Sequence, residues 1–316
     1  MWQATDSAVW QGRDDSRESP EALRVFQTVQ QHSAWPTTLG KGDIALIGFA
    51  SDTGVQRNQG RIGAAEAPPV LRRALANMAH HPAAFALHDA GDFVYADSQL
   101  EQGQQALAAA VCQIQQAGAR TLVLGGGHET AFAHGQGLFD AHPNQHISII
   151  NFDPHLDLRR APHATSGTPF AQLAALAQSQ GRAFDYTCIG ASRAANTAAV
   201  LPGAAALGVD IVWDTEVHWA NAAALAEKLQ QKCAAADAVY LTIDLDVLPA
   251  AQMPAVSAPA ALGIPLDLLL YLIRPILHSG KTLAADAVEY SPPYDREQQG
   301  ARSAARLLWQ IWQDWR

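Results

Sequence analysis

The sequence predicts an α/β fold with three layers, in which a doubly wound, mainly parallel sheet lies between two layers of helices. Short apolar runs rich in Val, Ile and Leu recur along the 316 residues and alternate with Ala-, Leu- and Gln-rich stretches of helical length. Runs that are apolar along their whole length are typical of parallel strands covered on both faces. Repeated alternation of strand and helix indicates crossover units within one sheet.

The strands are predicted first, because their apolar runs are the clearest pattern. "IALIGFA" is a typical example, since nearly every residue in it is apolar. The predicted strands are 44–50, 121–127, 146–153, 186–192, 209–214, 238–246 and 282–291.

Helices are expected in the stretches between and after these strands. The first carries Pro68 and Pro69 in its first turn, where the missing N–H has no partner to lose. Ser98 is placed to cap the second, and Gly118 follows its end. The predicted helices are 67–78, 98–118, 129–140, 168–181, 216–236, 265–280 and 301–313.

The chain shows no internal repeat and no long linker. Residues 1–40 are polar and are expected to form an N-terminal arm or cap, and residues 41–316 to form a single domain. Hydrophobic residues make up 48% and charged residues 16%, so the chain can build a large core and global disorder is not expected.

Charge and hydropathy argue against two classes of partner. The net charge is −9 and no basic stripe is visible, so no nucleic-acid partner is expected. No stretch approaches the roughly 18 apolar residues of a membrane span, and the N-terminus lacks the apolar core of a secretory signal. The three cysteines are far apart and form no C-x-x-C, so we expect buried thiols in a reducing cytoplasm.

Acidic and imidazole side chains follow four of the predicted strands. They are, in chain order, His128; Asp153, His155 and Asp157; Asp244 and Asp246; and Glu289. Because ligands of open α/β sheets bind at the carboxyl ends of the strands, we expect these side chains to share one rim of the sheet. A lone "GGGHE" or "DLD" is typical of an ordinary turn, but their joint occurrence at strand ends favours a site.

The residue types predict a metal centre. Four aspartates and two histidines, without cysteine, suit Mn²⁺ or Fe²⁺ better than structural zinc. Six ligands exceed the need of one ion and suit two ions about 3.5–4 Å apart with bridging carboxylates. Without cations, four neighbouring carboxylates would repel one another. In an extended chain residues i and i+2 point the same way, and Pro154 disfavours helix at Asp153.

Four motifs now identify a resemblance. "GGGHE", "NFDPHLDLR", "TIDLDVLP" and "AVEYSPPYD" resemble, in order, the metal and active-site motifs of the ureohydrolases, the family of arginase, agmatinase and formimidoylglutamase. The similarity runs from about residue 43 to the C-terminus, and implies an arginase-like catalytic domain for residues 41–316.

The resemblance also implies a ligand set for two Mn²⁺ ions per subunit. One ion would be held by His128, Asp153, Asp157 and Asp244. The other would be held by Asp153, His155, Asp244 and Asp246, so that Asp153 and Asp244 bridge. A hydroxide between the ions would be the nucleophile.

The positions at which this chain departs from the usual ureohydrolase motifs indicate which branch of the family it resembles. Arginases and agmatinases usually have G-G-D-H-S, where this chain has Gly127 and Glu129. Thr242 replaces a serine, a second Asp-Pro is missing after Asp246, and Ser166 stands where the family has a proton-shuttling histidine. "GGGHE", "TIDLDVLPA", "MPAVSAP" and "GVQRNQGRIGAAEAP" resemble the formimidoylglutamase branch.

That branch implies attack of the hydroxide on the formimidoyl carbon of N-formimidoyl-L-glutamate, which releases L-glutamate and formamide during histidine degradation. This small amidine has two carboxylates, and arginine binds carboxylates in bidentate fashion. The candidate substrate-binding residues are Arg57, Asn58, Arg61, Arg193, Asn196 and Glu289. The arginines are equally compatible with a solvated surface.

Three residues are candidates for catalysis. Glu289 resembles the family's acidic partner of the amidine nitrogens, and Asp246 is placed to pass a proton to the leaving nitrogen. With Ser166 in place of the histidine, His163 is the nearest candidate for a second shuttle, or else an ordinary loop histidine.

Other functions remain open at this point. One alternative is another ureohydrolase that acts on a guanidino substrate, such as an agmatinase, a guanidinobutyrase or an arginase-like enzyme. A second is a non-catalytic, metal-binding family member. A dehydrogenase is disfavoured, since no G-x-G-x-x-G follows the first strand. The family often assembles, so a homo-oligomer is expected.

Overall fold

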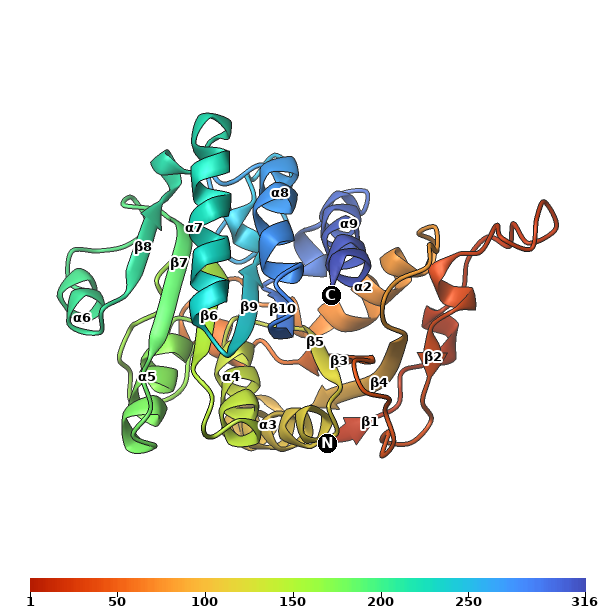
Figure 1. Ribbon diagram of the computed structural model, residues 1–316, viewed down its shortest axis with the longest axis horizontal. Helices are drawn as coiled ribbons and strands as arrows, with labels where there is room; N and C mark the ends of the chain where they lie inside the picture. The colour runs from red at the N-terminus through yellow and green to blue at the C-terminus, as the bar shows by residue number, and fades with distance from the viewer.

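The apolar runs and helical stretches form one central sheet with helices on both faces (Figure 1). The computed structural model describes residues 1–316, apart from the side chain of Asp97. The strands are β1 (Trp2–Gln3), β2 (Gln30–Gln31), β3 (Ile44–Ala50), β4 (Leu87–Val94), β5 (Arg120–Leu124), β6 (Ile147–Phe152), β7 (Asp185–Ala191), β8 (Asp210–Trp213), β9 (Ala238–Asp244) and β10 (Thr282–Val288). The helices are α1 (Thr53–Arg57), α2 (Ala67–Ala76), α3 (Leu100–Gln116), α4 (Thr130–Ala141), α5 (Pro169–Ser179), α6 (Leu201–Ala206), α7 (Ala222–Ala235), α8 (Leu266–Leu277) and α9 (Gln299–Asp314).

The sheet has ten strands in the order β1-β4-β3-β5-β10-β9-β6-β7-β8, and β2 also pairs with β4. The β1–β4 pair is antiparallel and the other described pairs are parallel. Every residue of β6 and β9 is buried, as expected of central parallel strands. The order places β5, β10, β9 and β6 side by side, so their carboxyl ends meet at one rim.

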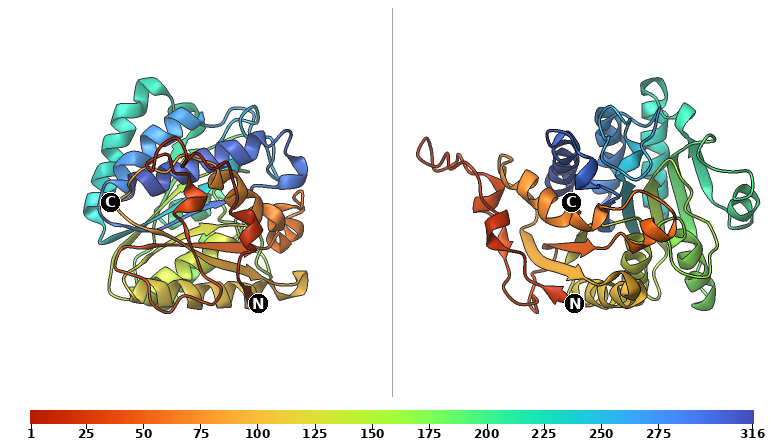
Figure 2. Two further views of the ribbon diagram at one scale, coloured as in Figure 1. Left: turned by 90° about the vertical axis from the view of Figure 1, so that its right-hand side faces the viewer. Right: turned by 180° about the vertical axis from the view of Figure 1, so that it is seen from behind.

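Two layers of helices cover the sheet, which confirms the predicted three-layer α/β/α fold. Helices α3, α4 and α5 lie on one face, and α2, α9, α8 and α7 lie on the other (Figures 1 and 2). Each layer buries an apolar stripe at helical spacing; in α8 it consists of Leu268, Leu269, Leu272, Ile273 and Ile276. No helix among the described residues is long and apolar enough to cross a membrane.

All seven predicted strands are present, but several end earlier than predicted. β5 ends at Leu124 because three glycines turn the chain, and β10 ends at Val288 because Glu289 has a φ of 69°. β9 ends at Asp244, where a 3₁₀ turn follows. The strands therefore stop just where the polar residues of the site begin.

The predicted helices are also present, with two corrections at their starts. Ser98 does not cap α3, since the helix begins after Gln99 and has no side-chain cap, whereas Gly118 follows its end as predicted with a φ of 82°. α7 begins at Ala222 rather than at residue 216, because short 3₁₀ turns occupy 214–216 and 219–221. α1 and α6, with five and six residues, are too short to show a helical pattern in sequence.

β4 was not predicted, because buried polar residues interrupt its apolar run. Arg72 of α2 is fully buried and donates to Asp89 at 2.9 Å and to Asp92 at 2.6 Å, both on β4. Asp89 also accepts hydrogen bonds from Thr5 and Trp10, so the same cluster holds the polar N-terminal segment. The boundary between an arm at 1–40 and a domain at 41–316 stays a prediction, although β1 and β2 of the arm both pair with β4.

Replacing Arg72 by methionine is expected to lower the free energy of unfolding by about 3–5 kcal/mol, because two buried carboxylates lose their cation. Urea unfolding monitored by circular dichroism measures this loss. The neighbouring Arg73 is exposed, so Arg73→Met is the matched control, with an expected change within about 0.5 kcal/mol. Equal stabilities of the two variants would contradict the role of Arg72.

Candidate metal centre and adjoining pocket

A glycine turn after β5 places His128 at the rim. The N–H of Gly126 bonds to the carbonyl of Phe49, and a Cβ on Gly126 would lie 1.7 Å from the carbonyl oxygen of Ser51, so only glycine fits there. The N–H of His128 donates to Oε1 of Glu289 at 2.8 Å. Its Nε2 lies 3.1 Å from the hydroxyl of Thr242, which leaves Nδ1 to face the aspartates.

The segment after β6 is shaped by its own side chains. Asp153 accepts the N–H of His155 at 2.6 Å and the amide of Asn151 at 3.1 Å. Asp157 has a φ of 48°, which is unusual for a non-glycine residue, and its Oδ2 lies 3.1 Å from Nδ1 of His128. The local fold therefore gathers all three predicted ligands of this segment.

Four ligands form a first group around His128. Its Nδ1 lies 3.0 Å from Oδ2 of Asp153, 3.1 Å from Oδ2 of Asp157 and 3.2 Å from Oδ2 of Asp244. One ligand atom from each of these residues lies within 4.8 Å of the others. His128 and Asp153 are fully buried, so an ion here would be shielded from bulk water.

Three ligands form a second group beside the first. Nδ1 of His155 lies 3.4 Å from Oδ1 of Asp153 and 3.3 Å from Oδ2 of Asp246. Asp153 thus belongs to both groups through its two oxygens, which would allow it to serve as a ligand of both ions. Asp244 lies in the first group, and its other oxygen accepts the N–H of Asp246 at 2.8 Å, so its role as a second bridge stays a prediction.

Electrostatics supports cation binding at this site. Burial raises the pKa of Asp244 well above its usual value, with Asp246 and Asp153 adding to the effect, and raises the pKa of Asp246 to about 6. Burial also opposes ionisation of Asp153, but His128 and His155 outweigh it and lower its pKa. Oδ1 of Asp246 is buried without a hydrogen-bond partner among the described residues. The donor set therefore fits two divalent cations.

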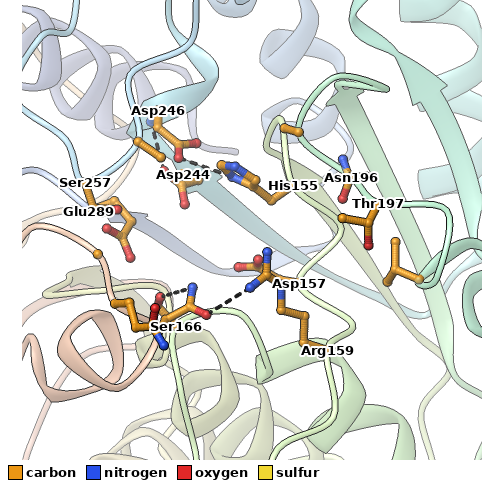
Figure 3. A pocket seen from close by; sticks show the side chains of 16 residues that line it. His155, Asp157, Arg159, Ser166, Asn196, Thr197, Asp244, Asp246, Ser257 and Glu289 are labelled. Carbon is orange, nitrogen blue, oxygen red and sulfur yellow. Dashed lines mark hydrogen bonds and ion pairs between the residues drawn. The ribbon is translucent and has the colours of Figure 1, made fainter.

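A cavity of about 300 Å³ opens above the metal ligands (Figure 3). Its polar lining includes Asn58, Gln59, Arg159, Ser166, Asn196, Thr197, Ser257 and Glu289, besides ligands from both groups. Nδ2 of Asn58 donates to the hydroxyl of Ser166 at 3.2 Å, and Arg159 donates to Oδ1 of Asn58 at 3.3 Å. These three side chains form one hydrogen-bonded part of the cavity wall.

Glu289 projects into this cavity from the end of β10 (Figure 3). Its φ of 69° is strained for a non-glycine residue, which is typical of functional sites. Oε1 is fixed by the N–H of His128, whereas Oε2 is buried without a partner among the described residues. Burial raises its pKa well above the usual value, and Asp244 and Glu129 add to this. A cation in the cavity would give Oε2 a partner and would counter the rise in the pKa of Glu289.

Two of the predicted substrate arginines point elsewhere. Arg57 pairs with Glu101 at 2.5 Å. Arg61 donates to the backbone carbonyls of Pro254 and Val256 and stacks over Tyr294 at 4.1 Å. Neither residue lines the cavity. Their contacts fix the chain, and a role in binding substrate stays a prediction.

Of the other three predicted residues outside the metal ligands, one lines the cavity and two do not. Arg193 stacks over Trp213 at 4.0 Å and lies outside the lining, and His163 lines a neighbouring hollow instead of the cavity. Asn196 does line the cavity, but its amide donates to Pro154 and accepts from the backbone of Leu156. Asn196 therefore holds the ligand-bearing segment in place.

Arg159 is the functional candidate that the sequence analysis missed. It closes the "NFDPHLDLR" motif and is the arginine in the lining of the cavity, two residues after the predicted metal ligand Asp157. Its spacing from Asp157 could have indicated it. Thr197 and Ser257, which also line the cavity, follow no comparable pattern.

The chain is similar to known proteins along almost its whole length. Residues 42–312 match the Arginase family. The chain is 55% identical over 316 residues to a formimidoylglutamase of Klebsiella pneumoniae, covering 100% of this chain and 99% of the relative. It is 52% identical over 315 residues to the formimidoylglutamase of Photorhabdus laumondii, with the same coverage.

Solved structures of formimidoylglutamases have a fold similar to that of this chain. The crystal structure of Trypanosoma cruzi formiminoglutamase with Mn²⁺ has a TM-score of 0.79 at 26% identity, covering 86% of this chain and 93% of that one. Formimidoylglutamase from Bacillus subtilis has a TM-score of 0.81 at 21% identity, covering 95% and 92%, and supports the fold alone.

Proposed function

The chain belongs to the arginase family, and we infer that it is a formimidoylglutamase, which hydrolyses N-formimidoyl-L-glutamate to L-glutamate and formamide in histidine degradation. The observation that carries this is the 52–55% identity, over the whole chain, to formimidoylglutamases. The gathering of all six expected metal ligands at one rim agrees with it.

We propose that the two ligand groups hold two Mn²⁺ ions per subunit. The oxygen and imidazole donors suit this ion, and the related trypanosomal enzyme was crystallised with Mn²⁺. When bound, such a pair of ions activates water at neutral pH for attack on a C–N centre.

Glu289 is proposed to hold the cationic amidine end of the substrate. Its Oε1 is anchored by the N–H of His128, so the unpaired Oε2 has a fixed position above the metal ligands. A carboxylate that is held in place before the substrate arrives orients the reacting carbon at little entropic cost. The positive amidine offsets the cost of ionising this buried acid.

Asp246 is proposed to move the proton. It lines the cavity, its Oδ2 lies 3.3 Å from His155, and its Oδ1 is buried without a partner among the described residues. A carboxylate at this position can accept a proton from the attacking water and deliver it to the leaving nitrogen. His163 lies outside the cavity, so no second shuttle is assigned to it.

Arg159 is proposed to bind a carboxylate of the glutamate moiety, in place of the three arginines named from the sequence. Arg159→Ala is expected to raise KM about 10- to 100-fold, the effect of losing a hydrogen bond to a charged group, while kcat changes less. Steady-state kinetics measures both parameters. Arg160→Ala is the matched control, since Arg160 lines the neighbouring hollow and not the cavity. Equal KM values for the two variants would remove Arg159 from the binding site.

A substrate panel tests the function itself. Formimidoyl-glutamate, arginine, agmatine and guanidino acids are offered to the enzyme with added Mn²⁺. We expect formamide and glutamate from the first compound and no urea from the others. Urea release would favour another ureohydrolase, and bound metal without any turnover would favour a non-catalytic member.

Location and assembly stay predictions. We propose a homo-oligomer, as the family resemblance implies, and a cytoplasmic location, as predicted from the cysteines and the N-terminal sequence. The ligand groups and the cavity described above are formed by one chain alone.

A further inference from the structure

Glu129 directly follows His128, one of the predicted metal ligands, and its known effect on the site is that it helps to raise the pKa of Glu289. It is fully buried and does not line the cavity. It stands at the N-cap of α4, but its side chain makes no capping hydrogen bond to that helix. A buried carboxylate is costly unless it is hydrogen-bonded, so its contacts indicate what it is for.

The carboxylate is bonded to a different segment of the chain. Its Oε1 accepts the N–H of Gly54 at 2.8 Å and the hydroxyl of Ser51 at 3.2 Å. The space around it depends on two glycines. A Cβ on Gly54 would lie 2.4 Å from the carboxyl carbon, and a Cβ on Gly127 would lie 2.1 Å from Oε2. Gly54 and Gly127 thus form a fitted cradle for this side chain.

The bonded segment carries part of the cavity wall. Gly54 lies in α1, and the N–H groups of Asn58 and Gly60 bond back to the carbonyls of Gly54 and Val55 at 3.0 and 2.9 Å. Asn58, Gln59 and Gly60 all line the cavity. The position of residues 58–60 in the cavity wall therefore depends on the position of Gly54.

The wall is connected to the arginine of the site. Asn58 donates to Ser166 and accepts from Arg159, so a shift of residues 53–60 would move the partner of Arg159. On their outer side these residues are held by the Arg57–Glu101 pair and by the contacts of Arg61. Glu129 is the buried, inner anchor of the same segment.

We propose that Glu129 is a positioning residue that fixes residues 53–60 against the cavity and thereby sets the affinity for the glutamate part of the substrate. The effect on affinity rests on the proposed function. The effect on the segment does not, because it follows from the contacts of Glu129 alone.

The test is Glu129→Ala in the full-length, Mn²⁺-loaded enzyme. Hydrogen exchange in peptides that cover 51–61 is expected to become at least about tenfold faster, because the N–H of Gly54 loses its acceptor. KM for formimidoyl-glutamate is expected to rise about tenfold, with kcat falling less than about threefold and the metal content unchanged. Glu129→Gln keeps an acceptor oxygen and is expected to restore most of both properties. Asp140→Asn, at the other end of α4, is the control and should match the wild type.

If hydrogen exchange of residues 51–61 is unchanged in Glu129→Ala, the proposal is overturned. It is also overturned if Glu129→Ala loses metal but has the wild-type KM when Mn²⁺ is saturating. Glu129→Gln exchanging as fast as Glu129→Ala would also overturn it. If the enzyme does not hydrolyse formimidoyl-glutamate in the substrate panel, the hydrogen-exchange measurement still tests whether Glu129 fixes residues 53–60. If Glu129→Ala does not fold, Gly54→Ala tests the same contact from the opposite side, and wild-type exchange in that variant would overturn the proposal.

Discussion

Asp153→Asn is expected to remove bound metal and to lower kcat/KM for formimidoyl-glutamate by about 10³-fold or more, which corresponds to about 4 kcal/mol of barrier. Asp153 belongs to both ligand groups, with Oδ2 3.0 Å from Nδ1 of His128 and Oδ1 3.4 Å from Nδ1 of His155. Asparagine keeps the size but offers one oxygen and one NH₂, so it cannot ligate two ions. It also removes one of the negative charges that attract them.

Metal content by inductively coupled plasma mass spectrometry and steady-state kinetics measure the two effects together. The matched control is Asp210→Asn, at the start of β8, because Asp210 pairs with Lys228 at 2.8 Å on the surface. Exposed pairs contribute about 0–1 kcal/mol, so this control should keep its metal and its activity. Full activity of Asp153→Asn with one ion or none would exclude a binuclear site.

The sheet and the ligands could be predicted together because one rule connects them. Parallel strands bring their carboxyl ends to the same rim, and polar residues at strand ends are visible in sequence. The structure places β5, β10, β9 and β6 next to one another, which is the adjacency that the sequence could not supply. His128, Asp153 and Asp244 meet because of that order.

The substrate side of the cavity was less predictable, because the direction of a long side chain depends on tertiary packing. Arg61 bonds to the carbonyls of Pro254 and Val256, almost 200 positions later in the chain. Arg159 lines the cavity, and Asp157, two residues earlier, has a positive φ of 48°. Neither fact follows from local composition or spacing.

β4 was missed for a related reason. A strand that carries His88, Asp89 and Asp92 does not resemble a buried strand until Arg72 is known to neutralise it. The stabilising partner lies on a helix, outside any window that a strand pattern can cover. Buried polar residues therefore conceal a strand even when the surrounding apolar pattern predicts its neighbours well.

Glu289→Ala is the second large effect, with an expected loss of about 10²–10³-fold in kcat/KM, in the range found when a fixed polar group at the reacting centre is removed. In the proposed role the unpaired Oε2 provides the negative charge for the amidine, and Oε1 accepts the N–H of His128. Alanine removes both. Glutamine keeps an acceptor for His128 and removes the charge, so Glu289→Gln separates the two roles.

We expect Glu289→Gln to retain both metal ions and still lose most of the activity. Metal analysis with steady-state kinetics checks this, and Glu297→Gln, on the exposed loop after β10, is the control. If Glu289→Gln is as active as the wild type, the charge does not bind the amidine and the role of Glu289 is to hold His128. If it loses metal as well, the negative charge of Glu289 supports metal binding, because the acceptor for the N–H of His128 is kept in this variant.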